Sequence, residues 1–401
     1  MSRREGASLL VVFNAGSSSL KFEVFDCRGG LRSVAQGAIR DIGHAGATLA
    51  FGAGSVSVGP VADAGEAAGI ALDRLLGGLD GFVLRADDVA ATGHRVVHGG
   101  DRFSAPVRVT VSVFDALKSL APLAPLHNPQ SLAVMQAVGE RFPDVPLVAV
   151  FDTGFFHALP ETARRYAIPA EWSERLGVRR YGFHGIAHEY LARQLDAAGG
   201  ARRAVTIHLG QGCSMTALSE GRPVDTSMGF TPLEGLVMGT RSGDVDPGVI
   251  LYLARQGLAW KELEDGLNRG SGLLGLSDAS DDVRELLALE SDGHAGARRA
   301  LAIFCMRIRK YLGAYAAVLG GVDAIAFGGG IGENSAEIRA RILADMEWLG
   351  VDLDAEANAC ASGRVGRISS ARSAVAVHVF PVDEEPLIAA AALDVLRDAT
   401  G

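Results

Sequence analysis

A turn of small residues, Asn14 to Lys21, joins two segments that have the pattern of β-strands. An apolar run at 9–13 precedes it and alternating residues at 20–25 follow it, which predicts strand, turn, strand. Backbone N–H groups of such a turn can converge on an anion, and its glycine allows close approach. Further donors are the side chains of Ser17, Ser19 and Lys21. The turn suggests a phosphate site, although many Gly/Ser turns between strands bind nothing.

A similar segment lies about half a chain later. Residues 207–214 also read as an apolar strand, a small-residue turn (Gly210, Gln211, Gly212) and a second strand. The first turn matches neither the G-x-x-x-x-G-K-[S/T] nor the G-x-G-x-x-G pattern. Two related domains, each with one such hairpin, would clamp a polyphosphate. Chance similarity stays open as the alternative, because the chain has 51 glycines.

Strand-like and helix-like segments alternate along the chain, which favours an α/β fold. The predicted strands are 9–13, 20–25, 146–151, 203–209, 213–218, 322–327 and 375–380. The predicted helices are 62–76, 129–140, 185–198, 281–290, 295–319, 335–348 and 385–397.

Composition narrows the class of protein. With 401 residues the chain is long enough for two domains, and its net charge of −9 argues against a nucleic-acid or anionic-membrane binder. Four widely spaced cysteines predict reduced thiols in a cytoplasmic protein rather than disulfides or a zinc site. No run approaches the ~18 apolar residues of a membrane span.

Polar residues concentrate in six further Gly-punctuated stretches. They are Gly93–Gly100, Pro125–Pro129, Phe151–Thr153, Tyr181–Gly185, Asp225–Pro247 and Phe327–Asn334. Histidines recur at i, i+4 spacing at His94/His98 and His184/His188, but H-E-x-x-H is absent, so we expect His94, His98 and His188 to pack rather than bind zinc.

On these motifs the chain resembles the acetate kinases, a family of the acetate and sugar kinase/Hsp70/actin superfamily, from Asn14 to the C-terminal helix. Asp225–Pro247 is nearly the family signature verbatim. The resemblance implies two duplicated actin-like (ribonuclease H-like) α/β domains with the active site in the cleft between them. We expect one domain at 1–152, completed by the C-terminal helix 385–401, and the other at 153–384.

The implied reaction is reversible in-line transfer of the ATP γ-phosphoryl group to acetate. The acceptor is already an anion, so the enzyme must hold two anions in line and neutralise charge rather than supply a strong base. Arginine suits this task because its guanidinium is always charged and can bind oxygens bidentately. The positions that match the family's catalytic residues are Arg95, Asp152, His184 and Arg241.

The resemblance also assigns binding residues. The acetate pocket would comprise Arg95, Val97, Leu126, Phe183 and Pro232. ATP would contact Ser17, Ser19, Lys21, His208, Gly210, Gln211, Gly212, Asp282, Val283, Arg284, Gly330, Ile331, Gly332 and Asn334, with Gly328–Gly332 as the adenosine-side loop. Asn14 and Glu384 would hold Mg²⁺, with Mn²⁺ as an alternative. The family further suggests a homodimer.

Three positions depart from the family pattern. Gln211 replaces the usual Asn, Asp383 brings an extra carboxylate before Glu384, and Phe156 stands where the family has His. We expect these changes to bear on rate and metal preference and not on reaction class.

Two alternatives remain open at this point. The chain could be a kinase of the same family that prefers propionate or butyrate, or that uses pyrophosphate as donor. It could instead be an actin- or Hsp70-like ATP-binding module, because fold alone does not separate these functions.

Overall fold

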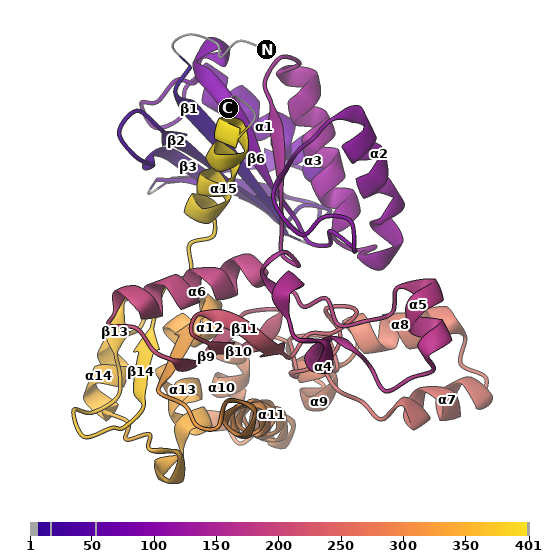
Figure 1. Ribbon diagram of the computed structural model, residues 1–401, viewed down its shortest axis with the longest axis vertical. Coiled ribbons are helices and arrows are strands. Elements are labelled where there is room, and N and C mark those ends of the chain that lie inside the picture. The colour runs from indigo at the N-terminus through magenta and orange to yellow at the C-terminus, as the bar shows by residue number, and fades with distance from the viewer. Residues whose placement is uncertain (1–6, 17, 53, 399–401) are drawn as a thin grey trace. The chain divides into compact units, whose positions relative to one another are not determined.

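The computed structural model describes residues 7–16, 18–52 and 54–398. The chain divides into two compact units, residues 1–155 with 383–401 and residues 156–382. Each unit is built on one β-sheet with helices packed on it (Figure 1).

The first unit holds an eight-stranded sheet in the order β5-β4-β3-β2-β1-β6-β8-β7. Its strands are β1 Leu9–Ala15, β2 Ser19–Asp26, β3 Arg32–Arg40, β4 Ala47–Phe51, β5 Gly54–Gly59, β6 Val89–Val96, β7 Val107–Arg108 and β8 Leu147–Phe151. Its helices are α1 Ala64–Gly77, α2 Val111–Ser119, α3 Asn128–Arg141 and α15 Glu385–Asp398.

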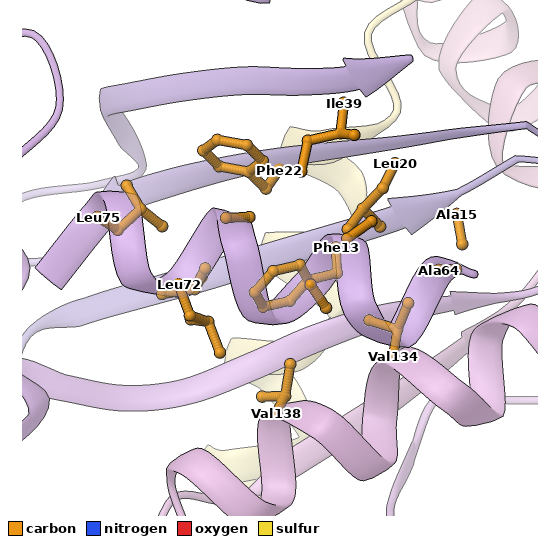
Figure 2. Packing of buried hydrophobic residues seen from close by; sticks show 14 of the residues in the cluster. Phe13, Ala15, Leu20, Phe22, Ile39, Ala64, Leu72, Leu75, Val134 and Val138 are labelled. Atoms are coloured by element: carbon orange, nitrogen blue, oxygen red, sulfur yellow. The ribbon is translucent and has the colours of Figure 1, made fainter. Parts of the chain in front are cut away.

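Helices cover both faces of this sheet. Phe13 of β1 stacks on His94 of β6 and belongs to the buried cluster that α1 and α3 complete (Figure 2). Side chains alternate along a strand, so Val12 and Gly93 face the other way. Ile388 of α15 lies 3.0 Å from where a Cβ on Gly93 would be. The C-terminal helix therefore packs on the face opposite α1 and α3, and each large apolar side chain buried in these layers contributes ~1.5–3 kcal/mol.

The second unit holds a six-stranded sheet in the order β11-β10-β9-β12-β14-β13. Its strands are β9 Arg203–Leu209, β10 Cys213–Ser219, β11 Arg222–Thr226, β12 Ala324–Gly328, β13 Gly366–Arg367 and β14 Ala376–Val379. Its helices are α4 Glu161–Arg164, α5 Ala170–Leu176, α6 Gly185–Ala197, α7 Pro247–Arg255, α8 Trp260–Arg269, α9 Gly272–Ser277, α10 Val283–Ser291, α11 Ala295–Leu319, α12 Gly329–Asn334, α13 Ala336–Leu343 and α14 Ala355–Cys360.

The two sheets repeat one topology. In the first unit β3, β2 and β1 pair antiparallel, and β6 and β8 continue the sheet in parallel. In the second unit β11, β10 and β9 pair antiparallel, and β12 and β14 continue in parallel. The hairpins β1–β2 and β9–β10 occupy equivalent places, which supports the predicted internal repeat and the duplicated α/β fold.

The predicted elements all occur, with three differences. The expected helix 335–348 ends at Leu343, and a separate 3₁₀ turn follows at Glu347–Leu349. The expected Gly-rich loop at 328–332 is the end of β12 and the beginning of α12. Sequence reasoning missed strands β3 to β7, β11 and β13 and helices α2, α4, α5, α7, α8, α9 and α14. Strands β3 and β5 are mostly exposed or half-buried, and polar residues and a glycine interrupt β6. None of the helices in the described part of the chain combines the length and apolar character needed to cross a membrane.

Candidate active site

In the first unit Arg95 and Asp152 form a bidentate ion pair. Strands β6 and β8 are parallel neighbours, so their carboxyl ends lie at the same edge of the sheet and bring the two residues together. Arg95 Nε donates to Asp152 Oδ1 at 3.1 Å, and Nη2 donates to Oδ2 at 2.6 Å. Burial alone would lower the pKa of Arg95, but the carboxylates of Asp152 and Glu384 outweigh it and raise that pKa. The guanidinium is therefore held charged and oriented.

Asn14 connects this pair to the start of the C-terminal helix. Its Oδ1 accepts from Arg95 Nη1 at 3.2 Å, while its Nδ2 donates to Glu384 Oε2 at 2.8 Å and to Glu385 Oε1 at 2.9 Å. The structure thus brings together Asn14, Arg95, Asp152 and Glu384. Sequence reasoning missed the buried Glu385, since nothing in the pair Glu384-Glu385 indicates which carboxylate turns inward.

Glu385 also belongs to a group of three carboxylates. Oxygens of Glu23, Asp383 and Glu385 lie within 4.8 Å of one another. Burial raises the pKa of Glu23, and burial together with Glu385 raises the pKa of Asp383 to about 7. Lys21 Nζ is 3.9 Å from Glu385 Oε1 and compensates part of this negative charge.

The β1–β2 turn carries the first predicted phosphate donors. The N–H of Gly16 donates to the Ser19 carbonyl at 2.8 Å and closes the turn. Lys21 is on β2, with its side chain 58% exposed. Ser17, the other predicted hydroxyl donor, lies outside the described residues.

In the second unit the β9–β10 turn meets His184 and Arg241. A Cβ on Gly212 would lie 3.1 Å from Cε1 and 3.2 Å from Nε2 of His184, and 3.5 Å from Nη1 of Arg241. A side chain there would be tight against the His184 ring, whereas its contact with Arg241 would be an ordinary one. His208 of β9 adds a third polar side chain, its ring centroid 4.8 Å from that of His184.

Arg241 differs from Arg95 in its surroundings. Its Nη1 donates to the Pro232 carbonyl at 3.0 Å and contacts Met238 Sδ. Among the residues that the structure describes, no carboxylate lies within ion-pair distance of Arg241, and burial lowers the pKa of its guanidinium. A half-buried cation without a carboxylate is suited to an anionic ligand.

His184 adopts an uncommon backbone conformation. It is the N-cap of α6 with φ 58° and ψ 30°, the left-handed region that non-glycine residues seldom occupy. The helix therefore begins at Gly185, where the predicted helix 185–198 also begins. On the other side of the ring, His184 Nδ1 lies 2.8 Å from Oγ of Ser214 on β10.

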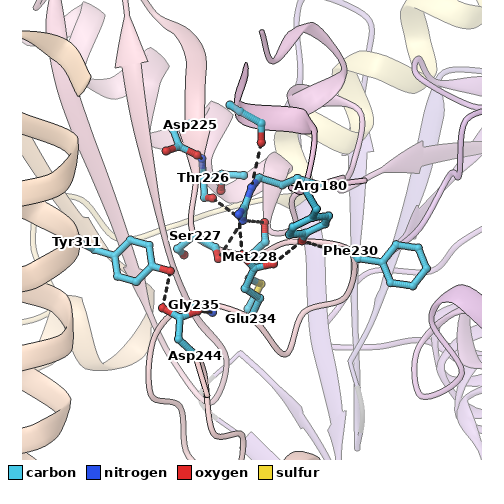
Figure 3. Close-up of polar contacts among 12 residues, drawn as sticks. Arg180, Asp225, Thr226, Ser227, Met228, Phe230, Glu234, Gly235, Asp244 and Tyr311 are labelled. Carbon is cyan, nitrogen blue, oxygen red and sulfur yellow. Dashed lines mark hydrogen bonds and ion pairs between the residues drawn. The ribbon is translucent and has the colours of Figure 1, made fainter. Parts of the chain in front are cut away.

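Arg180 holds the beginning of the signature segment (Figure 3). Its Nη1 donates to the carbonyls of Thr226, Ser227 and Met228 at 3.0–3.4 Å, and its Nη2 donates to Glu234 Oε1 at 2.6 Å. The segment leaves β11 at Thr226 and returns past Pro232 toward Arg241, so its path depends on this guanidinium.

Tyr166 binds the second carboxylate oxygen of Glu234. Its hydroxyl donates to Glu234 Oε2 and accepts from the N–H of Phe230 at 2.8 Å. Sequence reasoning named neither Arg180 nor Tyr166, because their partners lie 46–68 residues further along the chain.

The end of the segment has a separate support. Asp244 Oδ1 accepts from the N–H of Gly235 at 2.8 Å, and Oδ2 accepts from the Tyr311 hydroxyl at 2.8 Å. Arg307 of α11 donates to the carbonyls of Gly235 and Asp244. The beginning of the segment that carries Arg241 is therefore held by half-buried polar contacts, and its end by half-buried and exposed ones.

Gln211, the departure from the family's Asn, packs over this segment. A Cβ on Gly239 would overlap Gln211 Oε1, and the N–H of Gly239 donates to the Gln211 carbonyl at 3.2 Å. The longer amide thus fits against a glycine.

The residues predicted to bind acetate belong to both units. Val97 and Leu126 are in the first unit, Phe183 and Pro232 in the second. Val97 and Phe183 are buried, whereas Leu126 is 38% exposed.

The predicted nucleotide residues form two groups in the second unit. Asp282 caps α10 by accepting from the N–H of Arg284 at 2.7 Å, and the two side chains form an ion pair. Val283, which lies between them in the sequence, is buried. The second group is in α12, where Asn334 Nδ2 donates to the Gly330 carbonyl at 2.9 Å. Gly330, Ile331 and Gly332 thus belong to a helix turn.

Arg339 fixes the end of α12 and was not predicted. It is fully buried, and its Nη1 donates to the carbonyls of Gly332 and Glu333 at 2.8 Å. Its Nε and Nη2 donate to Asn358 at 2.8 and 2.7 Å. Burial lowers the pKa of Arg339 to about 10.

Comparison with known proteins shows the family of this chain. The model of the acetokinase family matches residues 9–390. The chain is 47% identical to an acetate kinase of Deinococcus deserti, with 98% of this chain and 99% of the relative covered, and 43% identical to one of Bacteroides thetaiotaomicron, with 97% and 99% covered.

Two solved structures are similar over their whole length. The acetate kinase of Porphyromonas gingivalis matches with a TM-score of 0.88 and 38% identity, covering 97% of this chain and 100% of that one. A propionate kinase of Francisella tularensis matches with a TM-score of 0.87 and 34% identity, covering 96% and 98%. The chain belongs to the acetokinase family.

Proposed function

We propose that this protein is a phosphotransferase that moves the γ-phosphoryl group of ATP to the carboxylate of acetate, reversibly, giving acetyl phosphate and ADP. The relatives named acetate kinase, at 43–47% identity over nearly the whole chain, support the reaction class. The observation that carries the proposal is Arg241, a guanidinium without a carboxylate partner among the described residues, beside His184 and the Gly212 turn.

The reaction draws on both units. Arg95, oriented by Asp152, orients the acetate carboxylate, which attacks as the anion it already is. Arg241 and His184 bind the equatorial oxygens of the transferring phosphoryl group, and the backbone N–H groups of Gln211 and Gly212 bind neighbouring phosphate oxygens. The N–H of Gly210 donates to the Gly212 carbonyl at 3.1 Å and closes the turn. Transfer is direct and in line, without a phosphoenzyme.

The residues at Asn14 and Glu384 fit a divalent cation. The carboxylates of Glu384 and Glu385 meet there at Nδ2 of the Asn14 amide, whose Oδ1 accepts from Arg95. The carboxylate oxygens are hard donors that suit Mg²⁺, with Mn²⁺ as the alternative, and Mg²⁺ takes few protein carboxylates. Asn14 would add its Oδ1 in place of the Arg95 contact. When bound, the ion would neutralise phosphate charge.

The choice of acid is the main alternative, since a propionate kinase is among the similar structures. The apolar side chains Val97, Leu126, Phe183 and Pro232 favour a short acyl tail. One methylene is worth only ~1–3 kcal/mol in such a pocket, so propionate should react more slowly than acetate rather than not at all.

We further propose that the protein is a cytoplasmic homodimer. Helix α7 carries exposed apolar residues, Val249, Leu251 and Tyr252, and Trp260 at the start of α8 is 70% exposed. Exposed apolar groups of this size mark association surfaces. Sedimentation at several concentrations tests this, and a monomer at all of them contradicts it.

The decisive assay traps acetyl phosphate as its hydroxamate in the presence of ATP, Mg²⁺ and acetate, propionate or butyrate, with pyrophosphate as a second donor. An actin- or Hsp70-like module would form no acid-dependent product. Arg241→Ala should lower kcat ~10³-fold or more, whereas Arg364→Ala, at an exposed arginine of the same unit, should leave it unchanged. Near-normal kcat in Arg241→Ala would refute the assignment.

A further inference from the structure

A chain of hydrogen bonds runs from His184 into the core of the second unit. His184 Nδ1 is 2.8 Å from Ser214 Oγ, and the same Oγ is 2.7 Å from Nε2 of His188. His188 Nδ1 is in turn 2.7 Å from Thr206 Oγ1. His188 is one turn along α6, Thr206 is on β9 and Ser214 on β10, and all three are fully buried.

The hydroxyl of Thr206 sets the direction of this chain. Within the described part of the molecule, His188 Nδ1 is its one hydrogen-bond partner. If His188 donated to Thr206, the buried Thr206 hydroxyl hydrogen would have no acceptor, and a buried unmatched donor is strongly disfavoured. Thr206 therefore donates to His188 Nδ1.

The remaining hydrogens follow in order. Burial, helped by neighbouring His208, lowers the pKa of His188 well below its ordinary value, so the ring is neutral and carries one hydrogen. Because Nδ1 accepts from Thr206, that hydrogen is on Nε2 and is donated to Ser214 Oγ. Ser214 then has its own hydrogen left for Nδ1 of His184.

We propose that Thr206, His188 and Ser214 form a relay that holds His184 as the neutral Nε2–H tautomer, so that Nε2 presents a hydrogen-bond donor to the phosphoryl group. The three are positioning residues. Protonation of His184 at Nδ1 would reverse every bond of the relay and leave the Thr206 hydrogen unmatched.

The surroundings of His184 agree with a neutral donor. Its Nε2 faces the Gly212 turn beside the Arg241 guanidinium, and the His208 ring centroid is 4.8 Å from that of His184. A second cation next to Arg241 would be repelled, whereas a neutral N–H can bind an equatorial oxygen that Arg241 also contacts. Phe156, where the family has His, sets its ring edge against His188 at 6.0 Å between centroids and keeps that side of the relay apolar.

The relay rests on the proposed role of His184, and a tautomer measurement tests it without reference to activity. In the full-length protein labelled with ¹⁵N-histidine, we expect long-range ¹H–¹⁵N spectra to show His184 and His188 protonated on Nε2. His184 protonated on Nδ1 in the wild type would overturn the proposal.

The kinetics of variants provide a second test of the relay. Ser214→Ala should lower kcat about 5- to 30-fold with KM for acetate and ATP within about twofold, since it removes an interaction on the transferring group. Thr206→Val should lower kcat about 3- to 10-fold and mix the tautomers, and Thr206→Ser should restore both.

Thr216 offers a matched control. It is buried, lies directly across from Thr206 in the β9–β10 pairing, and its Oγ1 bonds to Thr226 Oγ1 at 3.2 Å. Thr216→Val should leave kcat and the His184 tautomer unchanged.

The outcomes separate the relay from the reaction. Normal kcat and an unchanged His184 tautomer in both Ser214→Ala and Thr206→Val would overturn the relay while leaving the reaction class intact. A wild type without acid-dependent turnover would refute the proposed function, and the tautomer spectrum would still decide the relay.

Discussion

Arg180→Met removes the guanidinium that holds the beginning of the signature segment while keeping a side chain of similar length. The variant loses donors to three successive carbonyls, Thr226 to Met228, and leaves the Glu234 carboxylate without its cation. Burial alone would lower the pKa of Arg180, but Glu234 and Tyr166 raise it, so the wild-type residue is charged.

The expected loss follows from the exposure of the pair. Removing one partner of a buried ion pair costs ~3–5 kcal/mol. The side chains of Arg180 and Glu234 keep 16% and 30% of their exposure, so solvent screening reduces the expected loss in free energy of unfolding to about 2–4 kcal/mol. We also expect kcat to fall, because Pro232 and Arg241 are on the released segment.

Urea unfolding of the wild type, Arg180→Met, Glu234→Gln and the double variant measures this as a cycle. The coupling energy should be about 1–3 kcal/mol. Arg364→Met, at an exposed arginine, should change stability by no more than about 0.5 kcal/mol. A loss below about 1 kcal/mol in Arg180→Met, or a coupling below about 0.5 kcal/mol, would contradict the reasoning.

Three further predictions concern single residues. Gly212→Ala places a Cβ 3.1–3.2 Å from the His184 ring and should lower kcat ~10- to 100-fold in steady-state assays; unchanged kcat would show that the turn tolerates a side chain. Asp383→Asn should stabilise the metal-free protein above pH 7, because the folded-state pKa is raised to about 7 from 3.8. The raised pKa makes the stability of the wild type fall as pH rises from about 4 to 7. The gain in stability of Asp383→Asn, under ~1 kcal/mol for this exposed group, should therefore vanish below pH 4 in thermal unfolding at varied pH. A gain that does not depend on pH would exclude this cause. Arg339→Met breaks three buried hydrogen bonds and one part-buried one and leaves their acceptors without this donor. It should therefore cost ~3–5 kcal/mol in urea unfolding, and a loss under ~1 kcal/mol would be incompatible with the buried network.

Much of the fold was predictable because its signals are local. The apolar runs of β1, β9 and β12, and the 3.6-residue period of α3 and α11, can be read within one segment. The two strand–turn–strand hairpins also showed the duplication, which the sheet orders repeat.

Part of the candidate site was predictable for the same reason. Asp152 follows the predicted strand 146–151, whereas the strand that carries Arg95, β6, was not predicted and Arg95 was named by its motif alone. The structure shows that β6 and β8 are parallel neighbours, which brings the two residues together. The motifs also named Asn14 and Glu384, which the structure places in contact although 370 positions separate them.

What the sequence by itself determined is therefore the set of reactive side chains and the strands and helices that carry them. Tertiary structure alone decided how those side chains are oriented: that Arg180 holds the signature segment, that Arg241 keeps no carboxylate among the described residues, and that Ser214 joins His184 to His188. The physical reason is that these contacts join residues far apart in the sequence. The Ser214 hydroxyl on β10 and the His188 ring on α6 can bond only after the sheet and the helix have packed. Burial then removes water as a partner, so each donor must find its acceptor within the protein.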